Sequence, residues 1–245
     1  KARGNAIFGG KIVLDGSVGY GDIFAGENQD SDYAGDDRTF EFSRSNNDGS
    51  GGDMVDISGG LGYRFYIASQ EALSMWAVDE LWFTPLVGYS YHAQDLNIEQ
   101  GFQTIPAFGA FDGLHSSYSA EWQGPWAGFE LSGKKNKWIG SGRFEYHWAE
   151  YEAEADWNLR SDFQHPTSYT HEADNGKGMV FTLSGGYLIT DDWSVNLTAD
   201  IQDWQTDEGV DRTFFSNGTS GETQLNEVEW DSFAIMLGTT YRFGI

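Results

Sequence analysis

The sequence alternates between apolar and polar residues with a period of two, and this pattern limits the folds open to it more than any other feature. At the C-terminal end one parity carries only apolar or aromatic residues and one threonine: Phe233, Ile235, Leu237, Thr239, Tyr241 and Phe243. Successive side chains of a β-strand point to opposite faces, so a period of two predicts a strand with one apolar face. No apolar run reaches the ~18 residues that a membrane-spanning helix needs.

The same alternation recurs along the chain and predicts eight strands. They lie near residues 11–25, 53–67, 80–96, 117–133, 137–157, 178–189, 192–206 and 227–243. A further piece at residues 5–10 is the end of an earlier strand in this interpretation. Each segment has roughly the length that a tilted strand needs to cross a bilayer.

The connections between these strands alternate in length. Tight turns are predicted at Asp15-Gly16, at residues 133–137 and at residues 190–192, and a longer connection at 67–79 has room for a helical turn at 69–77. The opposite ends carry long acidic stretches at about 26–52, 97–116, 158–177 and 207–226. Short turns on one rim and long loops on the other are typical of an outer-membrane barrel. We therefore expect one barrel domain over residues 1–245.

The direction of the apolar face separates this interpretation from a soluble β-sandwich. In a sandwich the apolar face is buried, whereas in a membrane barrel it faces lipid. The polar parity here is rich in Ser, Thr, Gly and Asn, and many apolar rows end in Tyr or Trp, as interfacial girdles do. These features favour an all-β, closed antiparallel transmembrane β-barrel of 8–10 strands. Bacterial single-chain barrels have even strand numbers, so a strand at residues 5–14 would imply one more N-terminal strand.

Composition narrows the possible partners and cofactors. The chain has 38 acidic and 14 basic residues and a formal net charge of −24, which argues against binding nucleic acid. It has no cysteine, which removes disulfides and thiolate chemistry. The row Glu150, Glu152, Glu154 and Asp156 is compatible with Ca²⁺, but a solvated strand extension explains it better, and we expect no metal and no cofactor. The start lacks the pattern of a signal peptide and reads as mature or trimmed.

Several short segments, in their order along the chain, resemble one family. They are Gln29-Asp30-Ser31-Asp32-Tyr33, Glu41-Phe-Ser43-Arg44, Pro125-Trp-Ala-Gly-Phe, Phe144-Glu-Tyr146, Gly186-Tyr187-Leu-Ile-Thr190 and Gly238-Thr-Thr-Tyr241-Arg-Phe243. From Ser17 onward this layout resembles the omptins, ten-stranded outer-membrane proteases. The last segment is also similar to the C-terminal signal of bacterial outer-membrane barrels.

The resemblance implies a catalytic cleft at the extracellular rim, where an Asp–Asp pair faces an Asp–His pair across a water molecule. Asp30 and Asp32 match the first pair, and Asp156 with His165 is the candidate for the second. The sequence departs from the omptin Asp-x-His pattern, because an alignment without gaps puts Asn158 at the histidine. Two alternatives stay open. Asp162 with His165 has two intervening residues, and His171 lacks an acid two positions earlier.

Three functions follow as expectations. The missing Asp-x-His favours a non-catalytic or degenerate omptin-like barrel that acts as a scaffold or surface-binding protein. The first alternative is an endopeptidase that uses an activated water, and the second is a small porin. We expect the outer membrane of a Gram-negative bacterium, contacts with its lipid and lipopolysaccharide, and peptide or protein partners at the acidic loops. The lipopolysaccharide-binding positions of the family are matched only by Tyr89 and Lys134, since Tyr91 and Ala93 replace charged residues.

Overall fold

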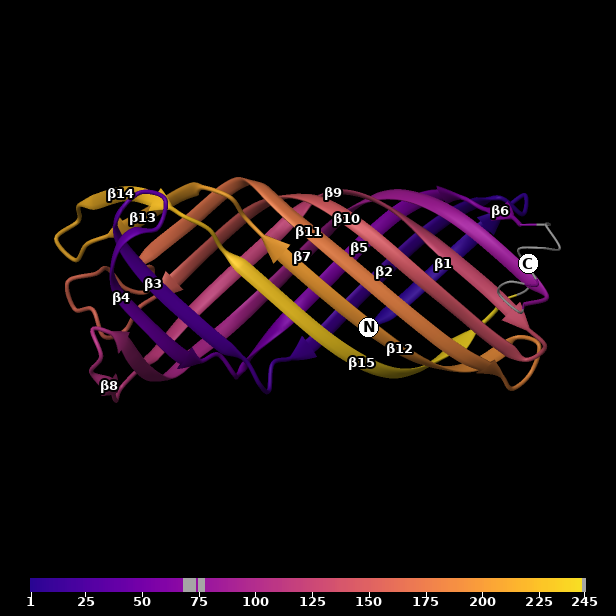
Figure 1. Ribbon diagram of the computed structural model, residues 1–245, viewed down its shortest axis with the longest axis horizontal. Coiled ribbons are helices and arrows are strands. Elements are labelled where there is room, and N and C mark those ends of the chain that lie inside the picture. The colour runs from indigo at the N-terminus through magenta and orange to yellow at the C-terminus, as the bar shows by residue number, and fades with distance from the viewer. Residues whose placement is uncertain (68–73, 75–77, 244–245) are drawn as a thin grey trace.

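The chain folds into one antiparallel sheet. A computed structural model describes residues 1–67, 74 and 78–243, and it contains a 15-stranded sheet (Figure 1). The strands are β1 (Ala2–Phe8), β2 (Ile12–Asp22), β3 (Glu27–Gly35), β4 (Thr39–Asp48), β5 (Gly52–Tyr63), β6 (Phe65–Tyr66), β7 (Glu80–Ile105), β8 (Gly109–Ala110), β9 (His115–Lys135), β10 (Trp138–Asp156), β11 (Tyr169–Leu188), β12 (Trp193–Gln205), β13 (Gly209–Phe214), β14 (Ser220–Leu225) and β15 (Glu229–Tyr241). Within these ranges no helix is both long and apolar enough to span a membrane. The helical turn predicted over 69–77 falls where only residue 74 is described.

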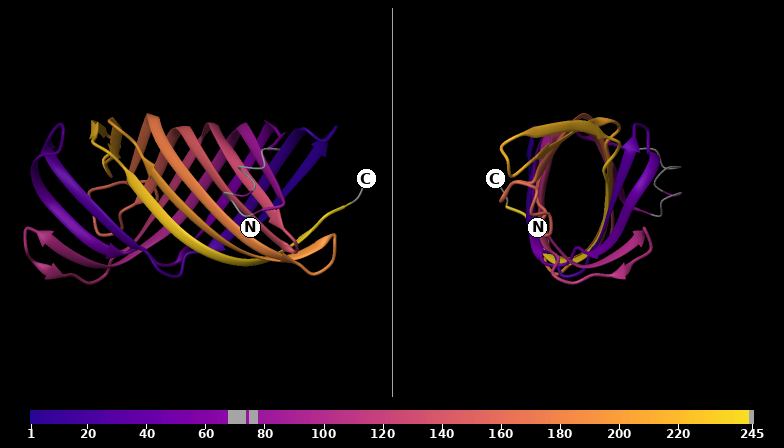
Figure 2. Two further views of the ribbon diagram at one scale, coloured as in Figure 1. Left: turned by 45° about the vertical axis from the view of Figure 1, so that its right-hand side comes forward. Right: turned by 90° about the vertical axis from the view of Figure 1, so that its left-hand side faces the viewer.

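The main strands form a curved wall. Its order is β1-β2-β5-β7-β9-β10-β11-β12-β15, and the wall curls around a central axis (Figure 2). The prediction of an all-β antiparallel architecture is therefore confirmed. Among the described residues β1 pairs only with β2 and β15 only with β12, so the sheet is not closed by pairing.

The first turn lies elsewhere than predicted. Asp15 and Gly16 are inside β2, where Asp15 lies opposite Asn5 on one side and Gly60 on the other. The chain turns instead at Gly9 and Gly10, whose φ angles are +57° and +72°. Both residues of a tight hairpin turn of this kind need positive φ, which two glycines supply without strain. An Asp-Gly pair is a frequent turn signal, but here the alternating pattern on both sides of it decides the structure.

The four long stretches predicted as loops are partly strands. The first contains the β3–β4 hairpin and the last the β13–β14 hairpin, while β7 and β11 extend well into the other two. Extended chain that leaves the sheet still has backbone N–H and C=O groups to pair, and hairpins pair them locally. At this end of the molecule, on the left in Figure 1 and called the top here, the wall therefore continues as ribbons beyond its middle.

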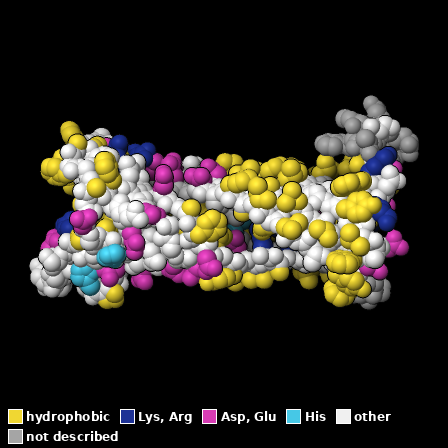
Figure 3. Space-filling model, turned by 90° about the horizontal axis from the view of Figure 1, so that it is seen from below, with side chains coloured by type: hydrophobic (Ala, Val, Ile, Leu, Met, Phe, Trp, Pro, Cys, Tyr) yellow, Lys and Arg dark blue, Asp and Glu magenta, His cyan; other side chains and the backbone are white. Residues whose placement is uncertain are grey.

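Apolar side chains cover the outside of the wall over half of its length. Phe181, Leu183, Val195 and Leu197 are 44%, 55%, 39% and 58% exposed. Hydrophobic side chains gather over the half of the molecule that ends in the short turns, and acidic side chains over the other half (Figure 3). The prediction that the apolar face looks outward is confirmed, and the soluble-sandwich alternative is wrong.

Both faces of the wall change polarity at the same height. Along β10 the outward row changes from Trp148 to Glu150, and the inward row changes from His147 to Ala149. Below this height the outside is apolar and the inside is polar, as lipid requires. Above it the inside is apolar and the outside is acidic, as in a water-exposed protein. The buried core of this upper part is formed by Ala120, Trp122, Ala149, Tyr151, Ala153, Ala173, Val180, Trp204 and Leu225.

Candidate functional site

Acidic groups and a histidine from three strands come together above this core, at the end of the curled wall that carries the long hairpins. We call this end the mouth. His171 of β11 lies directly opposite Asp211 of β13 in the strand pairing, with 3.9 Å between Nε2 and Oδ1. Asp30 and Asp32 of β3 stand within electrostatic range of Asp211. We call Asp30, Asp32, His171 and Asp211 the mouth cluster. Its members come from segments that are far apart in the sequence.

A chain of two tyrosine hydroxyl groups leads to the imidazole of His171. Tyr118 Oη lies 2.9 Å from His171 Nδ1 and is also hydrogen-bonded to the hydroxyl of Tyr151. The Tyr169 ring lies against the imidazole, with 5.0 Å between the ring centroids. Tyr151 can donate to Tyr118, which leaves Tyr118 free to donate to Nδ1. In that arrangement the imidazole hydrogen is on Nε2 and faces Asp211.

Two carboxyl groups of the mouth cluster, those of Asp30 and Asp211, have raised pKa values. Burial, with repulsion from Asp32 and Asp211, raises the pKa of Asp30 to about 7. Burial raises the pKa of Asp211 to about 6, with a further contribution from Asp32, although a hydrogen bond from Thr223 opposes it. Asp211 Oδ1 is buried and has no hydrogen-bond partner. A proton on one of these carboxyl groups removes part of the repulsion between them.

Burial also keeps His171 neutral. It lowers the pKa of His171 to about 4, so the imidazole carries no charge at neutral pH. The mouth cluster therefore has acidic groups that ionise near neutral pH and no compensating cation of its own. Such an arrangement attracts cationic groups from outside.

The second pair predicted from the sequence forms a contact of its own. Asp156 at the end of β10 and His165 in the following loop are in contact, with 2.5 Å between Oδ1 and Nδ1, but their side chains are 33% and 40% exposed. Asp162 pairs instead with Arg160, at 2.8 Å. Asn158 holds the loop by hydrogen bonds to Ser116 and the backbone of residue 115.

Sequence reasoning missed the acid that accompanies His171. It sought an aspartate two residues earlier on the same strand, whereas Asp211 comes from the neighbouring β13. Residues 209–214 lie in a stretch predicted as a loop, and the structure places them in β13. The sequence pattern likewise gives no role to Tyr118, Tyr151 and Tyr169.

Charged side chains cross the interior at the level of the apolar band. Arg143 of β10 reaches Asp15 of β2 at 3.0 Å and also pairs with Glu145. Arg3 lies 3.4 Å from Glu145. Two histidines join the same layer, since His147 contacts Glu145 at 3.2 Å and His92 contacts Asp56 at 2.7 Å. This layer links opposite walls beneath the apolar core.

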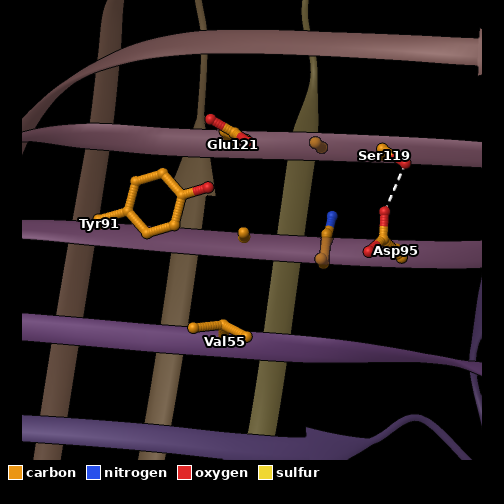
Figure 4. A pocket seen from close by; sticks show the side chains of 8 residues that line it. Val55, Tyr91, Asp95, Ser119 and Glu121 are labelled. Atoms are coloured by element: carbon orange, nitrogen blue, oxygen red, sulfur yellow. Dashed lines mark hydrogen bonds between the residues drawn. The ribbon is translucent and has the colours of Figure 1, made fainter.

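Two cavities open outside the mouth cluster. One, of about 330 Å³, is a depression in the outer wall over β5, β7 and β9, where Ser119 donates to Asp95 and Tyr91 points toward Glu121 (Figure 4). The other, of about 460 Å³, lies where the tip of the β3–β4 hairpin meets the β14–β15 connection. Among the described residues no group of three or more His, Asp or Glu side chains is arranged to hold a metal ion.

Comparison with known proteins supports the architecture and its setting. The structure is similar to the outer membrane protease OmpT from Escherichia coli, with a TM-score of 0.71, 13% identity, and coverage of 96% of this chain and 80% of that one. The resemblance to omptins is thus confirmed at the level of fold. No curated protein matches the sequence. The profile of the family described as "Pom: Protochlamydia outer membrane protein" matches residues 1–243. The chain is therefore a protein of the bacterial outer membrane, and it belongs to the Protochlamydia outer membrane protein family.

Proposed function

We propose that this chain is a non-catalytic surface-binding barrel whose acidic mouth holds cationic groups of a peptide or protein partner. The orientation of His171 carries the proposal. Its Nδ1 faces the hydroxyl of Tyr118 rather than a carboxylate, so the hydrogen on Nε2 leaves no lone pair there to accept a proton from water. The carboxyl groups of Asp30, Asp32 and Asp211 remain available for an ammonium or guanidinium group.

The membrane setting is part of the same proposal. Unpaired strand edges cannot face lipid, so we infer that the wall closes in the bilayer, with its apolar band in contact with lipid and lipopolysaccharide of a Gram-negative outer membrane. A closed barrel resists SDS at room temperature and changes its electrophoretic mobility on boiling. A mobility that does not depend on heating would contradict closure.

Binding is tested with a short arginine-rich peptide and its sequence-matched glutamate-rich counterpart. We expect the purified barrel in micelles to bind the first peptide and not the second. Asp211→Asn and Asp30→Asn should each weaken binding several-fold. Glu154→Gln is the control, since it also removes one acidic residue but lies on the outward face of β10. Equal binding by all variants would contradict the proposal.

An omptin-type endopeptidase is the second candidate. It is favoured by one observation, namely that Asp30 and Asp32 stand opposite a histidine–aspartate pair, although the acid comes from β13. This candidate requires the other imidazole tautomer, with the hydrogen on Nδ1 and a free lone pair on Nε2. Cleavage of the arginine-rich peptide by the wild type, lost in His171→Ala and in Asp30→Ala, would replace our proposal with this one.

A small porin is the remaining alternative. The polar lumen favours it, whereas the charged layer around Arg143 and Asp15 obstructs a free passage. Planar-bilayer recordings distinguish a porin from a binding barrel with an obstructed interior. We expect no steady conductance from the wild type, and an open steady channel would favour the porin.

A further inference from the structure

The tip of the β3–β4 hairpin touches β14 and the β14–β15 connection. Arg38 Nη2 lies 2.6 Å from Glu227 Oε1, and the Arg38 backbone N–H donates to Asn226 Oδ1 at 3.0 Å. Gln224 adds a weaker bond of 3.4 Å to Asp37. These contacts join residues of the first and last fifths of the sequence. Figure 1 shows the tip of the hairpin near β13 and β14.

The root of the hairpin is rich in glycine. Gly26 and Gly49 face each other through a backbone hydrogen bond of 2.9 Å. Gly51 and Gly52 follow, with φ angles of +85° and +121° that other residues rarely adopt. Glycine backbones change φ and ψ at low cost, so a rigid ribbon can rotate about such a root.

The body of the hairpin has few ties to the wall. Among the described residues β3 pairs with β4 alone, and β4 pairs with β7 only between Arg44 and Asp48, with two register irregularities. The half of β4 nearer the tip pairs through its backbone with β3, and Gln103 of β7 donates a hydrogen bond of 3.2 Å to the Ser43 hydroxyl. The ribbon is therefore held at its root, along this short and irregular pairing with β7, and at its tip, and opening it requires the β4–β7 pairs to break.

The acidic groups around the hairpin repel it from the position that it has in the structure. Asp30 faces Asp32, Asp211, Tyr118 and Tyr169, and Asp32 also lies within range of Arg160. His171, which lies beside Asp211, is neutral at pH 7. Arg160 is engaged by Asp162, so the balance at this point is repulsive whenever both Asp30 and Asp211 are ionised.

We propose that the β3–β4 hairpin is a hinged lid, latched by Arg38 on Glu227, and that its closure assembles the mouth cluster. The lid carries Asp30 and Asp32, whereas the rim carries His171 and Asp211, so opening separates the two halves of the cluster. The latch holds the lid closed against the repulsion between these carboxylates. The inference rests on the hairpin's geometry and stands whether or not the mouth binds cations.

Protonation sets the direction of the pH response. The pKa of Asp30 in the closed state is raised above that of a solvated aspartate, so the closed state binds more protons than the open state. Closure is therefore favoured below the ordinary pKa near 4 and is weakened as the pH rises toward 7. The open fraction should grow between pH 5 and pH 8.

The lid is tested by distance measurement between two spin labels. The chain has no cysteine, so Ala34→Cys on β3 and Ser220→Cys on β14 give a uniquely labelled pair. We expect one narrow, short distance at pH 5 and a second, longer population at pH 8. Arg38→Ala should enlarge the longer population several-fold at either pH, and Asp211→Asn should suppress it at pH 8.

Arg212→Ala is the matched control, because Arg212 pairs with Glu222 inside the β13–β14 hairpin and does not bridge to the lid. Heat-dependent electrophoretic mobility verifies that each variant is folded. A single narrow distance, unchanged by pH and by Arg38→Ala in folded protein, would show that the hairpin is a fixed part of the wall and would overturn the proposal.

Discussion

Arg143 of β10 and Asp15 of β2 form an ion pair across the interior, with 3.0 Å between Nη2 and Oδ1, and both side chains are at most 5% exposed. Three strands separate β2 from β10 along the wall, so the pair ties opposite sides together. Removing Arg143 leaves two buried carboxylates, Asp15 and Glu145, with Arg3 at 3.8 and 3.4 Å as their shared cation, and breaking a buried pair costs about 3–5 kcal/mol in proteins. We predict a loss of this size in the unfolding free energy of Arg143→Met, measured by tryptophan fluorescence in urea.

A double variant separates the charge from the packing. Arg143→Met combined with Asp15→Asn should regain part of the lost stability, because it leaves Arg3 with the single carboxylate of Glu145. A loss below about 1 kcal/mol in the single variant would contradict the role given to this pair.

Gly88 lies where the buried ring of Trp126 packs against the wall, and this position requires glycine. A Cβ on Gly88 would lie 2.5 Å from the Trp126 ring and closer still to the carbonyl of Gly59. A Cβ on Gly59, which lies outward, would meet nothing within 4 Å. We predict that Gly88→Ala destabilises the protein by about 1–3 kcal/mol, as overpacking does, while Gly59→Ala has little effect. Equal midpoints in urea for the two variants would contradict this packing.

Like charges face each other just above the apolar band. Asp53 lies directly opposite Asp22 on one side and Asp95 on the other. Opposed like charges destabilise a sheet, so Asp53→Asn should stabilise the protein by about 0.2–1 kcal/mol at low salt and by less at high salt. The control is Glu150→Gln, since Glu150 lies opposite the neutral Gln123. No gain, or the same gain in both variants, would mean that these pairs do not interact.

Binding of cations at the mouth should depend on pH. The raised pKa values of Asp30, about 7, and Asp211, about 6, mean that these groups are neutral at pH 5 and ionised at pH 8. Affinity for the arginine-rich peptide should therefore rise between these pH values, as titration calorimetry can measure. Asp211→Asn should flatten the profile, and a wild-type affinity that falls with rising pH would contradict the assignment.

The strands of the wall could be predicted because lipid and lumen impose opposite polarities on alternate residues. This alternation of polarity applies only to residues within the bilayer. Above it the inward row of β10 becomes apolar and the outward row acidic, so the β3–β4 and β13–β14 hairpins had no membrane pattern to reveal them.

The mouth cluster was half predictable for a related reason. Asp30 and Asp32 share a strand and a motif, so their spacing was informative. His171 and Asp211 meet through the pairing of β11 with β13, which local spacing does not encode. Asp156 and His165 do touch, but on an exposed loop, and their catalytic role stays a prediction.

The central claim is that the outward apolar band faces lipid. Single spin labels on the cysteine-free chain test this claim directly. Leu197→Cys lies within the band and Asp203→Cys lies on the same face of β12 above it. In lipid vesicles, we predict that a spin label at position 197 is relaxed by oxygen and shielded from a water-soluble nickel complex. A label at position 203 should show the reverse. A label at 197 that is shielded from both, as in a water-soluble protein with this residue in its core, would contradict the account.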